Sequence, residues 1–189
     1  MLLADTIEVF PRVVVELGMG DGRLLESLAR YDSRALHVGI EIDDEQCRQA
    51  SSWIRLSNVL VLNGAFEEVL QQFPDASVDT FLAVLPGPPY IEETEADRWR
   101  PLYKLAHKKL KSRGAFRLIT ELTDELLQPV SDSQYSAWTE RLRAEFISLG
   151  FVVSGWREGA PPEYSSRCLD QFRGDPQRIR LVTFDLVKP

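Results

Sequence analysis

Residues 13–22 of this chain read VVVELGMGDG, and this stretch decides the fold class. The β-branched run Val13–Glu16 is typical of a buried strand. A glycine-rich turn over 18–22 follows the run, and apolar residues then recur at helical spacing as far as Ala29. The chain therefore opens with a strand, a glycine turn and a helix, in that order.

The same alternation continues along the rest of the chain. The patterns predict further strands at 36–41, 59–63, 78–85, 116–121, 151–156 and 179–187, and helices at 44–54, 67–70, 101–111 and 134–149. This order predicts an α/β fold with a three-layer, doubly wound, mainly parallel sheet of the Rossmann-like kind. We expect an antiparallel edge strand, because no helix is evident between the last two strands. Without linkers or repeats, residues 1–189 are expected to form a single domain.

The composition excludes several classes of protein. The chain has 189 residues, of which 44% are hydrophobic and 27% charged, as in ordinary globular proteins. Two cysteines and two histidines cannot make a zinc or iron–sulfur pattern, so we expect no metal. The net charge of −7 argues against indiscriminate nucleic-acid binding. No apolar run reaches the ~18 residues of a membrane span, and no signal peptide is visible, so we expect a cytoplasmic protein without a membrane partner. Its thiols are expected to be reduced, with one long-range disulfide as the alternative.

The glycine turn favours one kind of cofactor over another. Its spacing is G-x-G-x-G, and Arg23 stands where a dinucleotide-binding motif has its last glycine. Glu16 and Asp21 flank the turn, and two carboxylates would repel a pyrophosphate. They suit a ligand that carries an ammonium and a sulfonium. Glu41 ends the second expected strand, where a carboxylate can bind the hydroxyls of a ribose.

The turn together with Glu41 resembles motifs I and II of the class I S-adenosylmethionine-dependent methyltransferases. The resemblance implies S-adenosylmethionine as cofactor, with Glu16 and Asp21 at its methionine ammonium and Glu41 at its ribose. The other residues expected to bind the cofactor are Gly18, Gly20, Gly22, Ile42, Asn63, Gly64, Ala65 and Leu85. The third strand end, 63–65, would frame the adenine, although Asn63 also fits a simple turn. The alternatives are a dinucleotide ligand and a glycine turn that binds nothing.

Two segments bear on the methyl acceptor. Residues 85–90 read LPGPPY and follow the fourth expected strand, where the transferred methyl would lie. Tyr90 there is either a stacking platform or a packed side chain. Residues 98–117 hold eight basic residues, Arg98 and Arg100 among them, and no acidic residue. Trp99 and Tyr103 are interleaved with them, a pattern typical of surfaces that meet phosphates and bases. The alternative is a solvated helix face.

A closer resemblance runs in order along the chain from Val13. The matching segments are 39–42 (GIEI), 56–59 (LSNV), 85–88 (LPGP), 120–121 (TE) and 165–188. They look like the tRNA (guanine-N7)-methyltransferase family. The resemblance implies tRNA, or another structured RNA, as acceptor, and substrate contacts at Thr120, Glu121 and Ser166.

The chain also departs from that family's pattern. Gly87 stands where the family carries an Asp, and Pro89 where it carries a Trp. An acidic run, 92–97, replaces the family's basic stretch. No side chain is therefore assigned as catalytic. A small-molecule methyltransferase of the same fold, or a cofactor-binding protein that has lost catalysis, remain as alternatives.

Overall fold

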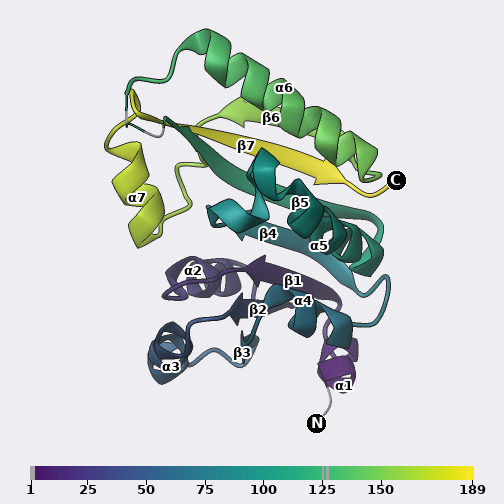
Figure 1. The fold of residues 1–189 in the computed structure, drawn as a ribbon. Coiled ribbons are helices and arrows are strands. Elements are labelled where there is room, and N and C mark those ends of the chain that lie inside the picture. The colour runs from purple at the N-terminus through teal and green to yellow at the C-terminus, as the bar shows by residue number, and fades with distance from the viewer. Residues whose placement is uncertain (1–2, 125, 127) are drawn as a thin grey trace.

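The centre of the molecule is a seven-stranded sheet (Figure 1). The computed structural model describes residues 3–124, 126 and 128–189. In sheet order the strands are β3 (Val59–Asn63), β2 (Ala35–Glu41), β1 (Arg12–Leu17), β4 (Val78–Val84), β5 (Leu110–Thr123), β7 (Ile179–Val187) and β6 (Val152–Glu158). The first five in this order are parallel, and β7 is antiparallel to both β5 and β6. The expected mainly parallel sheet with an antiparallel strand at this edge is confirmed.

Helices cover both faces of the sheet (Figure 1). One face carries α1 (Leu3–Glu8), α4 (Phe66–Val69), α5 (Ala96–Lys109) and α6 (Asp132–Ser148), and the other carries α2 (Arg23–Tyr31), α3 (Asp44–Trp53) and α7 (Arg167–Arg173). Short 3-10 turns are η1 (Leu70–Gln72), η2 (Pro88–Tyr90) and η3 (Glu93–Glu95). The three layers confirm the doubly wound class. The sequence analysis missed α7 between the last two strands, because its seven residues are too short to show a helical period.

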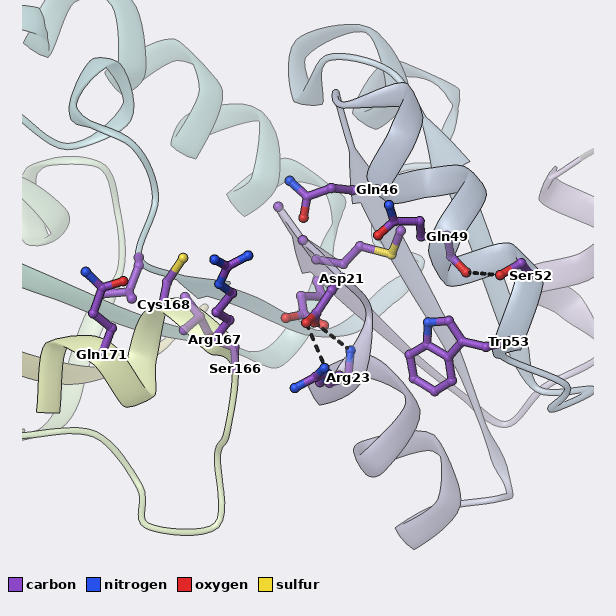
Figure 2. A pocket seen from close by; sticks show the side chains of 16 residues that line it. Asp21, Arg23, Gln46, Gln49, Ser52, Trp53, Ser166, Arg167, Cys168 and Gln171 are labelled. Carbon is purple, nitrogen blue, oxygen red and sulfur yellow. Dashed lines mark hydrogen bonds and ion pairs between the residues drawn. The ribbon is translucent and has the colours of Figure 1, made fainter. Parts of the chain in front are cut away.

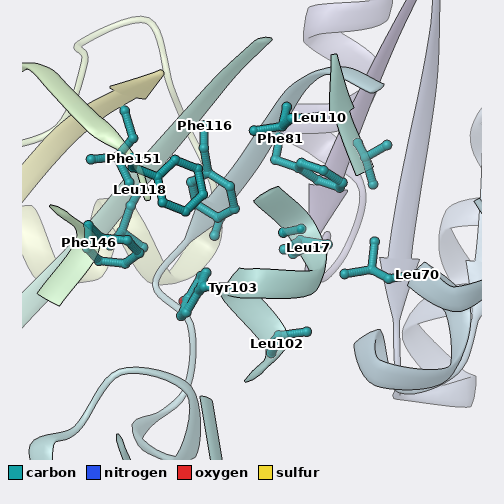
Figure 3. Close-up of a cluster of buried hydrophobic side chains, with 14 of the residues drawn as sticks. Leu17, Leu70, Phe81, Leu102, Tyr103, Leu110, Phe116, Leu118, Phe146 and Phe151 are labelled. Carbon is teal, nitrogen blue, oxygen red and sulfur yellow. The ribbon is translucent and has the colours of Figure 1, made fainter. Parts of the chain in front are cut away.

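The larger hydrophobic core lies between the sheet and the helices α5 and α6 that cover one of its faces (Figure 3). Trp99 and Tyr103 belong to this core and are only 0% and 1% exposed, so the expectation that they form part of an RNA-binding surface is wrong. The physical reason is their i, i+4 spacing, which places both on the face of α5 that packs inward. The ring of Tyr103 lies 5.1 Å from Phe146 and 5.5 Å from Phe116.

The sheet topology places the glycine turn at a crevice. β1 lies between β2 and β4, so the chain leaves β1 toward one side of the sheet and returns on the other. The backbone N–H groups of Gly18 and Met19 both donate to the carbonyl of Ile40, at 2.8 and 3.1 Å, which holds the turn against the end of β2. No helix within the described residues is long and apolar enough to cross a membrane.

Asn58 ties the layer of α2 to the sheet at the opposite end. Its buried side-chain amide donates to the carbonyls of Ala29 (3.1 Å), Asp32 (3.3 Å) and Ala35 (3.1 Å). These carbonyls belong to the last turn of α2, the following loop and the start of β2. One side chain thus satisfies three backbone carbonyls of this α–β connection.

We expect Asn58→Ala to lower the free energy of unfolding by about 2 kcal/mol, because it leaves buried carbonyls without a donor. Chemical denaturation followed by circular dichroism measures the change. Ser57→Ala, at the exposed neighbouring position, is the matched control and should stay within about 0.5 kcal/mol of the parent. An Asn58→Ala variant as stable as that control would contradict this role.

Candidate functional site

A cavity of about 960 Å³ opens at the carboxyl ends of β1 and β4 (Figure 2). Its walls come from α3 on one side and α7 on the other, and the glycine turn lies between them. The cavity is in the size range of small-molecule sites. Of the residues predicted from sequence, those that line it are Glu16, Gly18, Gly20, Asp21, Leu85 and Ser166.

The glycine turn has the backbone geometry that its residues predict. Gly18, Gly20 and Gly22 have φ angles of 76°, 54° and 77°, in the left-handed region that favours glycine. Gly22 begins α2, and a Cβ there would lie 3.0 Å from Ile54 and 3.1 Å from Ala50. Gly22 therefore serves the packing of α2 on α3, while Gly18 and Gly20 present bare backbone to the cavity.

Glu16 is the most unusual group in the cavity. Its neighbours Val15 and Leu17 point into the large core, so strand alternation turns Glu16 to the opposite face, toward α2 and α7. The residue is 2% exposed, and its Oε2 has no hydrogen-bond partner in the described part of the chain. Burial raises the pKa of Glu16 well above its ordinary value, and the nearby charges of Asp21 and Glu41 add to this. A cation placed here would be strongly favoured.

Asp21 is already partly neutralised. Its Oδ1 accepts from the backbone N–H of Arg23 at 3.2 Å, and its Oδ2 lies 3.2 Å from the Arg23 guanidinium. Both residues line the cavity. Asp21 thus has a partner within the protein, whereas the free oxygen of Glu16 has none among the described residues.

Glu41 lies beside the cavity and supports its floor. Its Oε2 accepts from the backbone N–H of Gly20 at 3.0 Å, and its Oε1 accepts from that of Asp43 at 3.0 Å. A carboxylate has about four acceptor positions, so two hydrogen bonds leave capacity for ribose hydroxyls. Glu41 is buried and lies close to the glycine turn, as its place at the end of the second expected strand predicts.

Four more residues predicted to bind the cofactor, Ile42, Asn63, Gly64 and Ala65, adjoin Glu41 without lining the large cavity. The Asn63 amide donates to the carbonyls of Glu41 (3.2 Å) and Ile42 (3.4 Å), and Gly64 N–H donates to the Glu41 carbonyl at 2.9 Å. Ala65 caps α4. Ile42 is 64% exposed, an unusual position for a large apolar side chain beside a polar turn. These residues form a rim at the ends of β2 and β3.

An aromatic pair, Phe66 and Tyr90, includes a residue of the segment 85–90, which is expected to face the methyl acceptor. The ring of Tyr90 lies 5.0 Å from that of Phe66, and the Arg98 guanidinium lies 5.8 Å from the Tyr90 ring. Phe66 is also the nearest neighbour of Gly18, 3.4 Å from the place of a Cβ. Burial raises the pKa of Tyr90, which is half-buried. The sequence analysis did not single out Phe66, because a lone aromatic at the start of a helix carries no signal of its own.

Thr120 and Glu121 lie together at the carboxyl end of β5, outside the lining of the cavity. Thr120 is fully buried, and neither its Oγ1 nor Oε2 of Glu121 has a hydrogen-bond partner among the described residues. Burial raises the pKa of Glu121 to about 7, with a smaller contribution from Glu92. Glu121 can therefore hold or release a proton near neutral pH.

The basic stretch is largely neutralised within the protein. Arg100 makes a bidentate ion pair with Glu145 of α6, at 2.9 and 2.7 Å, and is directed away from the cavity. The other internal pairs are Lys108 and Lys109 with Asp75, Lys111 with Asp79, and Arg117 with Asp185. Within the described residues, Arg98, Lys104 and Arg113 make no ion pair with a carboxylate. Two residues of the basic stretch are predicted from sequence to contact the substrate. Arg98 lies beside Tyr90, whereas Arg100 is paired with Glu145.

The sequence analysis missed most of the cavity walls. Gln46, Gln49 and Trp53 recur on one face of α3, and this spacing was a usable signal. On the other wall, Arg167, Cys168 and Gln171 belong to the helix that was not predicted. Cys168 is exposed and Cys47 is buried, and both thiols are free. The part of the chain that the structure describes holds no group of three His, Cys, Asp or Glu side chains placed for a metal ion.

Comparison with known proteins identifies relatives of the chain. A family model described as "Putative methyltransferase" matches residues 11–145. A tRNA (guanine-N(7)-)-methyltransferase of Campylobacter fetus subsp. fetus (strain 82-40) is 31% identical over 112 residues. That match covers 58% of this chain and 28% of the relative, so the chain corresponds to only part of the relative's length.

Solved structures confirm the fold. The 16S rRNA methyltransferase KamB has a TM-score of 0.73 at 14% identity, over 98% of this chain and 92% of its own. An antibiotic-related methyltransferase has a TM-score of 0.70 at 20% identity, over 97% and 91%. A 16S rRNA (adenine(1408)-N(1))-methyltransferase from Catenulisporales acidiphilia, solved with its cosubstrate SAM, has a TM-score of 0.70 at 15% identity, over 97% and 88%. These structures share the fold of this chain, and the match over residues 11–145 shows that the chain belongs to the methyltransferase family described as "Putative methyltransferase".

Proposed function

We propose that this protein transfers the methyl group of S-adenosylmethionine to a ring nitrogen of structured RNA, with guanine N7 of tRNA as the first acceptor to test. The observation that carries the proposal is the buried Oε2 of Glu16, which has no hydrogen-bond partner among the described residues, in a cavity floored by the glycine turn. Residues 1–189 would act as one methyltransferase domain in the cytoplasm.

The residues present fit the proposed cofactor. Glu16 offers a buried anion to the methionine ammonium, and Gly18 and Gly20 let the backbone come close. Glu41 retains acceptor positions for the ribose diol. The rim of Ile42 and 63–65 offers apolar surface and backbone groups to the adenine. When bound, the cofactor supplies an electrophilic methyl group on a positively charged sulfur.

The residues of the chain would position the acceptor and exclude water from the site of transfer. Leu85 and the Phe66–Tyr90 pair stand next to the glycine turn, where they can enclose the acceptor and hold it in line with the methyl group. Guanine N7 already carries a lone pair, so its methylation needs no strong base. The absence of a side chain at Gly87 is therefore compatible with this acceptor. The RNA assignment itself is supported by the tRNA-modifying relative.

A second candidate is a small-molecule acceptor. The observation in its favour is the internal pairing of five of the eight basic residues at 98–117, which leaves few of the eight to bind phosphates. The paired residues are Arg100, Lys108, Lys109, Lys111 and Arg117. A cofactor-binding protein without catalysis is a third reading, suggested by Gly87.

The acceptor class is tested with methyl-labelled S-adenosylmethionine and an extract of cells that lack this protein, divided into RNA, protein and small-molecule fractions. We expect label in the tRNA fraction that ribonuclease removes, and 7-methylguanosine after digestion to nucleosides. Label confined to small molecules would support the second candidate. Bound cofactor without label in any fraction would support the third.

Glu41→Ala should weaken binding of S-adenosylmethionine by about 1–3 kcal/mol, the usual loss for a hydrogen bond to a charged group. Isothermal titration calorimetry on the purified protein measures this. Glu45→Ala is the matched control, because Glu45 is exposed on α3 and pairs with Arg48 instead. Equal affinity of the Glu41 and Glu45 variants would remove Glu41 from the cofactor site.

Cofactor binding should also be linked to ionisation of Glu16. The pKa of Glu16 is raised in the free protein, and a bound ammonium would lower it, so binding releases a proton. Affinity should therefore increase as the pH rises above the ordinary glutamate range, until Glu16 is ionised in the free protein as well. Calorimetry at one pH in buffers of different ionisation enthalpy counts the released protons. Glu16→Gln should bind more weakly and release fewer protons; an unchanged proton count would refute the linkage.

A further inference from the structure

Among the described residues, four acidic or basic side chains line the cavity, two of each kind. Glu16, Asp21, Arg23 and Arg167 all line it. Asp21 and Arg23 neutralise each other through the 3.2 Å ion pair described above. Glu16 and Arg167 are left, and neither has an ion-pair partner among the described residues. They approach the cavity from different elements. Glu16 belongs to β1, and Arg167 belongs to α7, where Figure 2 labels it.

One anion and one cation without partners match an α-amino acid. The methionine part of the proposed cofactor carries an ammonium and a carboxylate on the same carbon. If Glu16 takes the ammonium, the carboxylate needs a cation on the other side of the cavity. Resting on the proposed cofactor, we propose that Arg167 binds this carboxylate and makes the site selective for a ligand with an intact amino-acid end.

The surroundings of Arg167 support this assignment over Arg23. The helix that carries Arg167 is anchored by Leu169, which is fully buried against the layer of α2. Ser166, just before it, caps the helix by accepting from the Leu169 N–H at 3.2 Å, and also lines the cavity. Arg173 is already used, since it donates to the Tyr164 carbonyl at 2.7 Å. Arg167 is thus held at the cavity on an anchored helix, and its guanidinium has no ion-pair partner within the described part of the chain. A guanidinium can bind a carboxylate through two parallel hydrogen bonds.

The test compares S-adenosylmethionine with decarboxylated S-adenosylmethionine, which keeps the ammonium and sulfonium but lacks the carboxylate. Calorimetry measures both affinities without any turnover. The parent protein should bind S-adenosylmethionine at least about tenfold more tightly than the decarboxylated form. Arg167→Gln should lose about tenfold in affinity for S-adenosylmethionine and change little toward the decarboxylated form. Arg167→Lys should keep part of the selectivity, because it keeps the charge.

Two further variants make the test specific. Arg178→Gln is the matched control, because Arg178 lies in the same segment, pairs with Asp175 and is absent from the cavity. Loss of selectivity in Arg23→Gln but not in Arg167→Gln would overturn the assignment. So would an equal loss for both ligands in Arg167→Gln, since that indicates a merely structural role. A parent protein that binds S-adenosylmethionine without selectivity refutes only this inference, whereas one that binds neither ligand refutes the proposed function as well.

Discussion

The site depends on the carboxylate of Glu41, which joins two segments that come from different strands. By accepting from Gly20 N–H and Asp43 N–H, it fixes the turn after β1 relative to the start of α3. One side chain at the end of β2 thereby sets the glycine turn relative to the wall formed by α3. These two hydrogen bonds keep the glycine turn beside the strand ends. The left-handed glycines, the exposed Ile42 and the side chain of Glu16 can form one site because the turn is held in this position.

The cofactor end of the site could be predicted from sequence because its signals are local. The turn, its flanking carboxylates and the second-strand acid lie within 30 residues of one another, and the order of strands and helices fixes where they meet. The walls could not be predicted in the same way. Arg167 reaches the cavity on a seven-residue helix far along the chain, and tertiary packing, including that of Leu169, places it there.

The acceptor end shows a different limit. The basic residues at 98–117 form a conspicuous run in sequence, yet their partners, such as Asp75, Glu145 and Asp185, are distant in sequence and become neighbours only in the fold. The sequence pattern around Trp99 and Tyr103 is ambiguous, because aromatic side chains among basic residues suit both an RNA surface and the buried face of an amphipathic helix. The burial of the two side chains decides between these alternatives, and it depends on how α5 packs against the sheet.

The placement of β7 between β5 and β6 makes one wall of the cavity depend on strand pairings that are distant in sequence. In the described sheet β6 pairs only with β7, and β7 joins it to β5. The segment with α7 connects β6 to β7, so a change that weakens the pairing of β7 with β5 would also disturb the wall that carries Arg167. The glycine turn follows β1, which pairs with β2 and β4, and is therefore remote from a change at that edge of the sheet.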